Sequence, residues 1–347
     1  MDNLFDRHWE LALRAELNGD APPPIDADNW LNPEERNRLL LDAIRDLIAA
    51  GPDRWDIRLT QMALMDMAQG FRKLQPHRHR RKVTVFGSAR TPSTSPEYAL
   101  ARDLGKGLAE AGFMVITGAG GGVMAAAHEG AGERDSLGFN IHLPYEQAAN
   151  PVVAETDHLL SFRFFFVRKL FFAKEADALV VFPGGFGTLD ETFELLTLMQ
   201  TGKTPLVPML LMDTDASGYW DELLDVVERQ LIESGFVSEA DRQLLRPCRD
   251  VEEAVSQIAG FYRNYHSTRI VDGCVRMRMH IAPEPPALME MHERWGELTE
   301  NGFRIESAHD DEGDEPGLND LHRLVFTFKG RDWSTLVNLI HFINTLR

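Results

Sequence analysis

The stretch PGGFGTLDE, residues 183–191, holds residue types that suit the binding of a phosphate group. It follows the apolar run ADALVVF and precedes TFELLTLMQTGK, so a strand is expected to end where a helix begins. A glycine turn at a helix start presents bare backbone N–H groups, and the positive end of the helix dipole attracts anions. The sequence therefore predicts an anion site at this turn.

Two further glycine turns follow earlier strand-like runs, GSAR at residues 87–90 and GAGGGVM at residues 118–124. Parallel strands end at one edge of their sheet, so three such turns would meet there and form a phosphate cradle. Together with the helix before the third turn, they supply the residues expected to bind phosphate or nucleotide: Gly87, Ser88, Arg90, Gly118, Gly120, Gly122, Lys169, Gly184, Gly185, Gly187 and Thr188.

The turns do not match the common nucleotide fingerprints. GxGxxG is absent after KVTVF, and no acidic residue stands at the end of the second strand to bind a ribose hydroxyl. No turn reads GxxxxGK[ST] either. These absences favour a mononucleotide over a dinucleotide, and they disfavour a P-loop ATPase.

Glu191 has two interpretations. In the first, TLDE is a capping box in which Thr188 caps the helix and Glu191 reaches back to the cap, a structural role worth ~1 kcal/mol. In the second, the carboxylate faces the ligand's sugar and stabilises the positive charge that develops as a glycosidic bond breaks. Local spacing does not separate the two.

Arg168 and Lys169 lie in RFFFVRKLFF, where the many phenylalanines predict deep burial. A charged pair in such a stretch is costly unless it finds partners. Either the polar stripe of this helix reaches solvent, or Arg168 reaches the nucleotide pocket and binds base, phosphate or carboxylate through its fork of donors.

Other reactive side chains give weaker signals. Ser88 lies outside a GxSxG context, so its hydroxyl is expected to contact phosphate rather than act as a nucleophile. The histidines at 128, 142 and 158 are scattered, which indicates packing or surface roles. Cys248 and Cys274 are far apart and form no CxxC motif or Cys/His cluster. We therefore expect no metal and no cofactor.

Alternating strand and helix patterns begin at Lys82 and position these turns. The runs KVTVF, FMVIT, LGFNIHL, ALVVF and PLVPMLLM predict strands, and amphipathic stretches between them predict helices. This order predicts an α/β fold, a Rossmann-like doubly wound parallel sheet whose ligand lies beyond the carboxyl ends of the strands.

Two flanking parts surround this predicted nucleotide-binding and catalytic domain of residues 77–266. Residues 1–76 read as a helical extension, and residues 267–347 as a small βαββα unit, ferredoxin-like or regulatory in type. The basic HRHRRK, residues 77–82, reads as a solvated linker, with contact to a phosphorylated ligand as the alternative. The acidic segment 309–320 reads as a solvated hairpin loop, because its spacing is wrong for a calcium loop.

The formal net charge of −18 over 347 residues argues against a nucleic-acid or anionic-membrane binder. No stretch approaches ~18 consecutive apolar residues, and the first residues lack a basic-then-apolar leader pattern. The expectation is a soluble, cytoplasmic protein.

Taken together, GSAR, TGAGGGVMAAAHEGA, the Arg-Lys pair and PGGFGTLDE resemble the Lonely Guy (LOG) family, cytokinin riboside 5′-monophosphate phosphoribohydrolases often mislabelled as lysine decarboxylases. The resemblance covers about residues 82–265 and matches PGGxGTxxE at every defined position. It implies a Rossmann-like fold, a homodimer or higher homo-oligomer, and metal-free hydrolysis of an AMP-like nucleoside 5′-monophosphate to free base and ribose 5-phosphate. The family's catalytic pair then falls on Arg168 and Glu191, and its phosphate turn on Gly185, Gly187 and Thr188.

Departures from the family pattern concern the base. Phe165 and Phe166 replace the usual Met-His, and Ala119 interrupts the triple glycine of the second turn. A pyridoxal phosphate decarboxylase would need a Schiff-base lysine and a partner for the pyridine nitrogen, which the sequence does not place. The rival hypothesis is a non-catalytic carrier or sensor of a phosphorylated ligand, in which Glu191 would bond only to its own helix.

Overall fold

The computed structural model describes residues 33–142, 148–271, 273–308, 317–330 and 332–346. Its contacts divide into two compact units, one of Met1–Leu59 with His309–Asn319 and one of Thr60–Ala308 with Asp320–Arg347. In the first unit the structure describes the helix α2 (Pro33–Ala49) and the start of α3 (Arg54–Leu74). The rest of α3 and every element below belong to the second unit.

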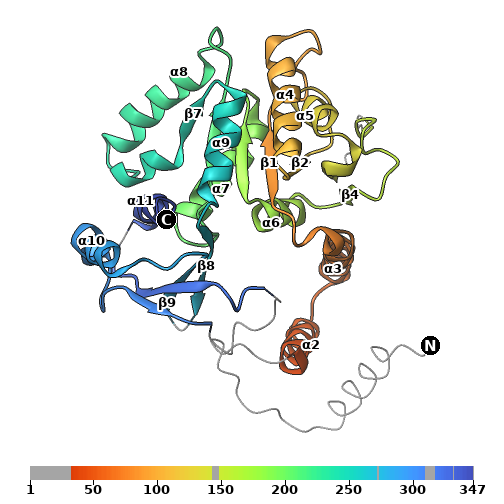
Figure 1. Ribbon diagram of the computed structural model, residues 1–347. Coiled ribbons are helices and arrows are strands. Elements are labelled where there is room, and N and C mark those ends of the chain that lie inside the picture. Colours follow the sequence, from red (N-terminus) through yellow and green to blue (C-terminus); the bar gives the residue numbers. More distant parts are fainter. Residues whose placement is uncertain (1–32, 143–147, 272, 309–316, 331, 347) are drawn as a thin grey trace. The chain divides into compact units, whose positions relative to one another are not determined.

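A parallel sheet of seven strands, in the order β4-β3-β2-β1-β5-β6-β7, forms the centre of the second unit (Figure 1). Its inner strands are short apolar runs with helices on both faces, which confirms the predicted α/β doubly wound fold. The strands are β1 (Lys82–Phe86), β2 (Met114–Thr117), β3 (Ser136–Ile141), β4 (Leu159–Phe162), β5 (Ala178–Val181), β6 (Met209–Met212) and β7 (Arg246–Cys248).

Helices cover both faces of this sheet. The helices α4 (Pro96–Glu110), α5 (Val123–Ala131) and α9 (Val251–Phe261) share one apolar cluster with Val83 and Val85 of β1. The helices α6 (Phe165–Glu175), α7 (Phe186–Gln200) and α8 (Tyr219–Val226) contribute to the cluster on the other face. Short helical segments complete the domain: η1 (Gln75–His77), η2 (Glu133–Asp135), the π-helix η3 (Val227–Ile232) and η4 (Glu239–Leu244).

The C-terminal part is an antiparallel sheet in the order β10-β11-β9-β8. The predicted βαββα unit takes RIVDGCVRMRMHI, residues 269–281, as its first strand, and this is wrong. The chain reverses near Gly273, whose φ is 71°, and forms a hairpin. The part is therefore ββαββα rather than the βαββα of the ferredoxin-like expectation. Its elements are β8 (Tyr265–Val271), β9 (Cys274–Met279), α10 (Pro285–Trp295), η5 (Gly296–Leu298), β10 (Arg304–Glu306), β11 (His322–Thr327), η7 (Trp333–Thr335) and α11 (Leu336–Ile343).

One hydrophobic core runs from the parallel sheet into the antiparallel one. Met277 and Met279 of β9 and Leu339 of α11 belong to the same cluster of buried residues as Phe171 of α6 and Leu195 of α7. The C-terminal part is therefore packed against the α6–α7 face of the parallel sheet and is not a tethered appendage.

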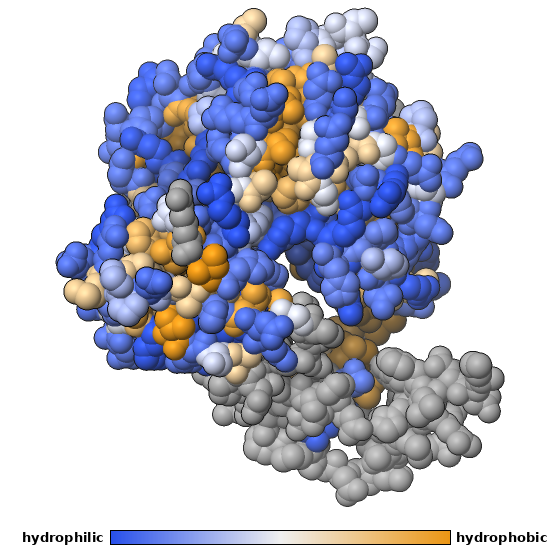
Figure 2. All heavy atoms as spheres, in the orientation of Figure 1, coloured by the Kyte–Doolittle hydropathy of each residue, from blue (hydrophilic) through white to orange (hydrophobic). Residues whose placement is uncertain are grey.

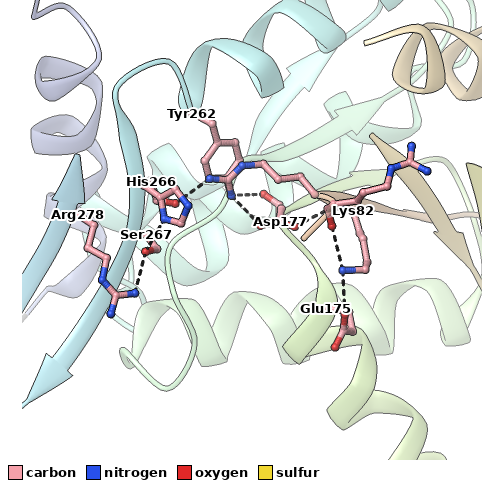
Figure 3. Close-up of polar contacts among 9 residues, drawn as sticks. Lys82, Glu175, Asp177, Tyr262, His266, Ser267 and Arg278 are labelled. Carbon is pink, nitrogen blue, oxygen red and sulfur yellow. Dashed lines mark hydrogen bonds and ion pairs between the residues drawn. The ribbon is translucent and has the colours of Figure 1, made fainter. Parts of the chain in front are cut away.

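The expectation of a solvated linker at HRHRRK is wrong for its last residues. Lys82 is 3% exposed and pairs with Glu175 at 3.1 Å. The Arg81 guanidinium pairs with Asp177 at 2.9 Å and donates to the His266 carbonyl at 3.0 Å. Figure 3 shows these contacts beside Tyr262, whose ring lies 3.6 Å from the Arg81 Cζ. The basic run therefore fastens β8 to the amino-terminal edge of the parallel sheet.

The face drawn in Figure 2 is mostly hydrophilic, with apolar residues in separate groups. Among the described residues, no helix is long and apolar enough to span a membrane. Most of the predicted acidic hairpin loop, residues 309–316, lies outside the described residues.

Candidate active site

The three glycine turns lie together at the carboxyl ends of β1, β2 and β5. The Ser88 N–H donates to the Pro183 carbonyl at 3.1 Å, and the Ser88 carbonyl accepts from the Val123 N–H at 3.1 Å. The first turn is thus bonded to the other two, as the parallel topology predicts.

Glycines in these turns serve two different needs. A methyl group on Gly122, whose φ is 60°, would lie 2.2 Å from the Ser88 carbonyl oxygen, and one on Gly184 would lie 2.2 Å from the Thr188 Oγ1. Methyl groups on Gly185 and Gly187 would meet nothing within 4 Å. Gly122 thus allows the second turn to pack closely on the first, and Gly184 allows close packing within the third turn. Gly185 and Gly187 leave the approach to the backbone open.

The helix α7 starts at Phe186, with Gly185 as its N-cap and no side-chain cap. Its first backbone bond runs from the Leu189 N–H to the Gly185 carbonyl at 3.1 Å, so the N–H groups of residues 186–188 have no partner inside the helix. The capping-box interpretation is therefore wrong, because Thr188 lies within the first helical turn. The uncapped N–H groups and the helix dipole suit an anion.

Arg168 of α6 and Glu191 of α7 form an ion pair beside these turns. The Arg168 Nη2 lies 2.7 Å from the Glu191 Oε1, and both side chains are about nine-tenths buried, with 11% and 10% exposed. Burial raises the pKa of Glu191 above its ordinary value of 4.5, although the charge of Arg168 opposes this shift. Glu191 is thus a buried carboxylate held by another helix.

The surroundings of Arg168 connect it to the second turn. Its Nη1 would lie 3.9 Å from a methyl group on Gly118, and its Cζ lies 5.1 Å from the centre of the Phe165 ring. Gly118 and Gly120 in turn face the Met124 side chain, which a methyl group on either would meet within about 3 Å. The guanidinium therefore lies between the second turn, an aromatic ring and Glu191.

Lys169 points elsewhere. Its Nζ lies 2.8 Å from the Asp190 Oδ2 and 2.7 Å from the Glu194 Oε2, and these two carboxylates raise its pKa despite partial burial, which acts to lower it. Lys169 thus joins α6 to α7, and its expected contact with phosphate stays a prediction.

The first turn offers two more polar groups. The half-buried Ser88 hydroxyl accepts from the Arg90 N–H at 3.1 Å. Arg90 is exposed, and no hydrogen bond or ion pair joins its guanidinium to a described residue. The expected contact of Ser88 and Arg90 with phosphate stays a prediction.

Deep burial of the whole Arg168 helix is not found. Val167, Phe171 and Phe172 are buried, whereas Phe165 and Phe166 are 49% and 55% exposed. A helix on a sheet can bury only one stripe, so its remaining aromatic side chains face outward.

Several residues near the turns were not predicted from the sequence. The Tyr219 hydroxyl donates to the Gly184 carbonyl at 2.8 Å. Asn150 donates from its backbone N–H to the Ala119 carbonyl at 2.8 Å, and its side chain contacts buried His128. These contacts join residues 22 to 35 positions apart outside any periodic pattern, so no local signal marks them. In the described part of the chain, no group of three or more His, Cys, Asp or Glu residues could hold a metal ion.

Comparison with known proteins gives related sequences that match about half of the chain. A family model described as a possible lysine decarboxylase matches residues 121–258. A probable cytokinin riboside 5′-monophosphate phosphoribohydrolase of Oryza sativa subsp. japonica is 33% identical over 172 residues, which are 48% of this chain and 66% of the rice protein. The cytokinin riboside 5′-monophosphate phosphoribohydrolase of Rhodococcoides fascians is 30% identical over 182 residues, 51% of this chain and 89% of that protein.

A solved structure, the molybdenum cofactor binding protein of Rippkaea orientalis, covers 52% of this chain and 97% of its own length at 20% identity, with a TM-score of 0.38. The sequence matches carry the assignment, since the relative from Rhodococcoides fascians is matched over most of its length. The chain belongs to the LOG family, whose family model bears the description of a possible lysine decarboxylase.

Proposed function

We propose that this protein hydrolyses the N-glycosidic bond of a nucleoside 5′-monophosphate and releases free base and ribose 5-phosphate. The observation that carries the proposal is the buried ion pair between Arg168 and Glu191, which lies beside an uncapped helix start at the meeting point of three glycine turns. An anion site and a buried carboxylate in one place match a substrate with a phosphate at one end and a reacting sugar at the other.

The phosphate is held by the N–H groups at the start of α7, with help from Ser88 and Arg90. The open space around Gly185 and Gly187 lets the oxygen atoms of the phosphate approach this backbone. Fixing the phosphate also fixes the ribose, so binding energy away from the glycosidic bond lowers the barrier at the bond.

Glu191 faces the ribose or the attacking water in this proposal. As a carboxylate it stabilises the oxocarbenium-like charge that develops when the base departs, and as a base it accepts a proton from the water. Arg168 orients this carboxylate through its 2.7 Å contact. Burial raises the pKa of Glu191, and the charge of the guanidinium opposes this shift and so favours the carboxylate form.

The printed names of the relatives support the same chemistry. The rice and Rhodococcoides fascians proteins are named for the hydrolysis of cytokinin riboside 5′-monophosphates. For this chain the proposal does not specify which base is released. The reason is that Phe165, whose ring lies beside Arg168, departs from the sequence pattern of the LOG family.

A carrier or sensor of a phosphorylated ligand is the alternative. It would have Glu191 bonded only to its own helix, whereas the carboxylate pairs with Arg168 of the neighbouring helix. The pair favours the enzyme, because a purely structural cap has no use for a buried cross-helix arginine.

The test is base release from the common nucleoside 5′-monophosphates by wild type, Glu191→Gln and Glu194→Gln. The matched control Glu194 lies on the same helix and is also paired with a cation, at 2.7 Å from Lys169. We expect Glu191→Gln to lose at least ~100-fold in kcat/KM, as loss of a group that stabilises transition-state charge commonly does, and Glu194→Gln to stay within a few-fold.

Nucleosides without the 5′-phosphate should be very poor substrates for the wild type. Nucleotide binding without base release by the wild type would support the carrier instead. A Glu191→Gln variant as active as Glu194→Gln would remove Glu191 from the chemistry.

We also propose a homo-oligomer. Exposed apolar side chains lie on the two helices that carry the ion pair: Phe165, Phe166 and Leu170 on α6, and Phe186 and Phe193 on α7. We call these five residues the α6–α7 apolar face.

A further inference from the structure

Ala119, in the second glycine turn, has an unusual backbone conformation. Its φ of 60° makes it the one non-glycine residue with a positive φ among the described residues. Left-handed φ is unfavourable for alanine because its Cβ crowds the backbone, and such conformations persist only where the surroundings impose them. The contacts around Ala119 must therefore hold the turn.

Three hydrogen bonds hold this turn, and Asn150 provides two of them. The Ala119 N–H donates to the Thr117 Oγ1 at 2.9 Å, and its carbonyl accepts from the Asn150 N–H at 2.8 Å. The Asn150 Nδ2 donates to the Gly120 carbonyl at 3.2 Å. Asn150 thus donates hydrogen bonds to two consecutive carbonyl groups of the turn.

His128 fixes the orientation of the Asn150 amide. The His128 Nε2 lies 3.2 Å from the Leu137 carbonyl, which can only accept, so the Nε2 carries the proton. Burial lowers the pKa of His128 to about 4, so near neutral pH its Nδ1 is an acceptor. The Nδ1 then accepts from the Asn150 Nδ2 at 3.2 Å, which directs this amide nitrogen to the Gly120 side.

The held turn faces the candidate active site. Gly118 precedes Ala119, and a methyl group at Gly118 would lie 3.9 Å from the Arg168 Nη1. Meanwhile the Ala119 methyl group packs on β3, 2.9 Å from where a methyl group on Gly138 would lie. The Ala119 methyl group therefore packs against the sheet, and the carbonyl groups of Ala119 and Gly120 are hydrogen-bonded, which holds the turn in place beside Arg168.

We propose that Asn150 is a positioning residue for the reaction: it holds the turn of residues 118–120 beside Arg168, with Ala119 in its left-handed conformation. This inference rests on the proposed function and extends it to a residue that touches neither Arg168 nor Glu191. It also explains how this chain keeps an alanine where glycine would adopt the conformation freely.

The test compares Asn150→Ala with Asn344→Ala. Asn344 is a matched control, since it is 7% exposed and also bonds backbone groups, accepting from the Asn264 and Tyr265 N–H groups and donating to the Phe261 carbonyl. Both variants should lower the melting temperature. Asn150→Ala should lose ~100-fold in kcat/KM, as misplacement by about 1 Å commonly costs, and Asn344→Ala should stay within about twofold.

Restoration separates positioning from stability. Adding Ala119→Gly to Asn150→Ala should recover about tenfold of the lost kcat/KM, because glycine takes the left-handed conformation without the amide. Asn150→Asp, which cannot donate to the Gly120 carbonyl, should resemble Asn150→Ala. A folded Asn150→Ala variant within a few-fold of wild type would overturn the inference, and so would a folded double variant with no recovery.

Failure of the proposed function gives a different result. If wild type releases no base, the role of Asn150 is tested instead by the Kd of AMP, measured by calorimetry for wild type and the variants. The inference then predicts weaker AMP binding by Asn150→Ala and recovery in the double variant, whereas equal affinity in wild type and Asn150→Ala would refute it.

Discussion

At the scale of single residues, the environment of Glu191 predicts how activity depends on pH. Burial raises the pKa of this carboxyl above 4.5, and Arg168 opposes the shift without cancelling it. The carboxylate form is therefore lost, as pH falls, at a higher pH than for an exposed glutamate. The proposed reaction needs the carboxylate, so kcat/KM should decline on the acid side with a midpoint above 4.5.

The measurement is kcat/KM against pH for wild type and Glu191→Gln. The residual rate of Glu191→Gln should lack the acid limb. An acid limb at or below 4.5 in the wild type would contradict the assignment. The same shift has a consequence for stability with a definite sign: the contribution of neutral Glu191 is full below 4.5 and is lost as pH rises through the raised folded-state pKa.

Individual residues show which parts of the candidate site can be predicted from the sequence alone. The order of strands and glycine turns in the sequence was enough to expect the three turns at one sheet edge, because parallel topology places strand ends together. For Arg168 the sequence left solvent and the nucleotide pocket as alternatives. The choice between a cap and a cross-helix ion pair at Glu191 was not predictable. It depends on α7 starting at Phe186 and on a guanidinium 23 positions away in the chain.

At the scale of elements, α4 and α5 pack with almost no space between their backbones. A methyl group on Gly105 of α4 would lie 2.1 Å from the Ala127 carbonyl oxygen, and one on Gly130 of α5 would lie 1.8 Å from the Arg102 carbonyl oxygen. Since α5 begins directly after the second glycine turn, this close packing also sets the position of that turn.

Alanine at Gly105 should therefore destabilise the protein, while alanine at a roomy helical glycine should not. Gly260 of α9 is the matched control, because a methyl group there meets nothing within 4 Å. We expect Gly105→Ala to lower the free energy of unfolding by about 1–3 kcal/mol through overpacking. Gly260→Ala should raise it by up to about 1 kcal/mol, since alanine favours helix. Urea unfolding of both variants measures the difference, and a change of the same sign in both would contradict the packing argument.

Which elements the sequence predicts depends on their length and burial. The inner strands β1, β2 and β5 are fully buried apolar runs and were predicted. The edge strands β4 and β7 have four and three residues, and β7 contains Pro247, so neither has a readable period. The β8–β9 hairpin was read as one strand because β-branched residues stand on both sides of its turn, Ile270 and Val271 before it and Val275 after it.

At the scale of the whole molecule, one hydrophobic core includes residues on both sides of the predicted domain boundary at residue 266. Buried residues of β9 and α11 join the cluster formed by α6 and α7, and the contacts of Arg81 connect the β8 backbone to Asp177 at the start of β5. Since α6 and α7 carry the ion pair, the C-terminal sheet supports the helices of the candidate site while supplying none of its turns.

The α6–α7 apolar face predicts assembly. Phe166 is 55% exposed and Phe186 is 95% exposed, on two helices joined by the salt bridges of Lys169. Exposed apolar side chains on two neighbouring helices of a highly charged protein favour association, because burying them against a second copy removes them from water. The solution mass should therefore be a multiple of the 39.2 kDa of one chain.

An aspartate in the α6–α7 apolar face should dissociate this assembly, because a buried carboxylate without a partner is costly. Phe166→Asp is the variant of choice, since Phe166 is exposed and makes none of the contacts of the ion pair. Phe236→Asp is its matched control, because Phe236 is 79% exposed and lies outside both helices. Light scattering should give the mass of one chain for Phe166→Asp and the assembled mass for Phe236→Asp. A wild type that already has the mass of one chain would refute the assembly, and a Phe166→Asp variant that keeps the assembled mass would move the interface away from this face.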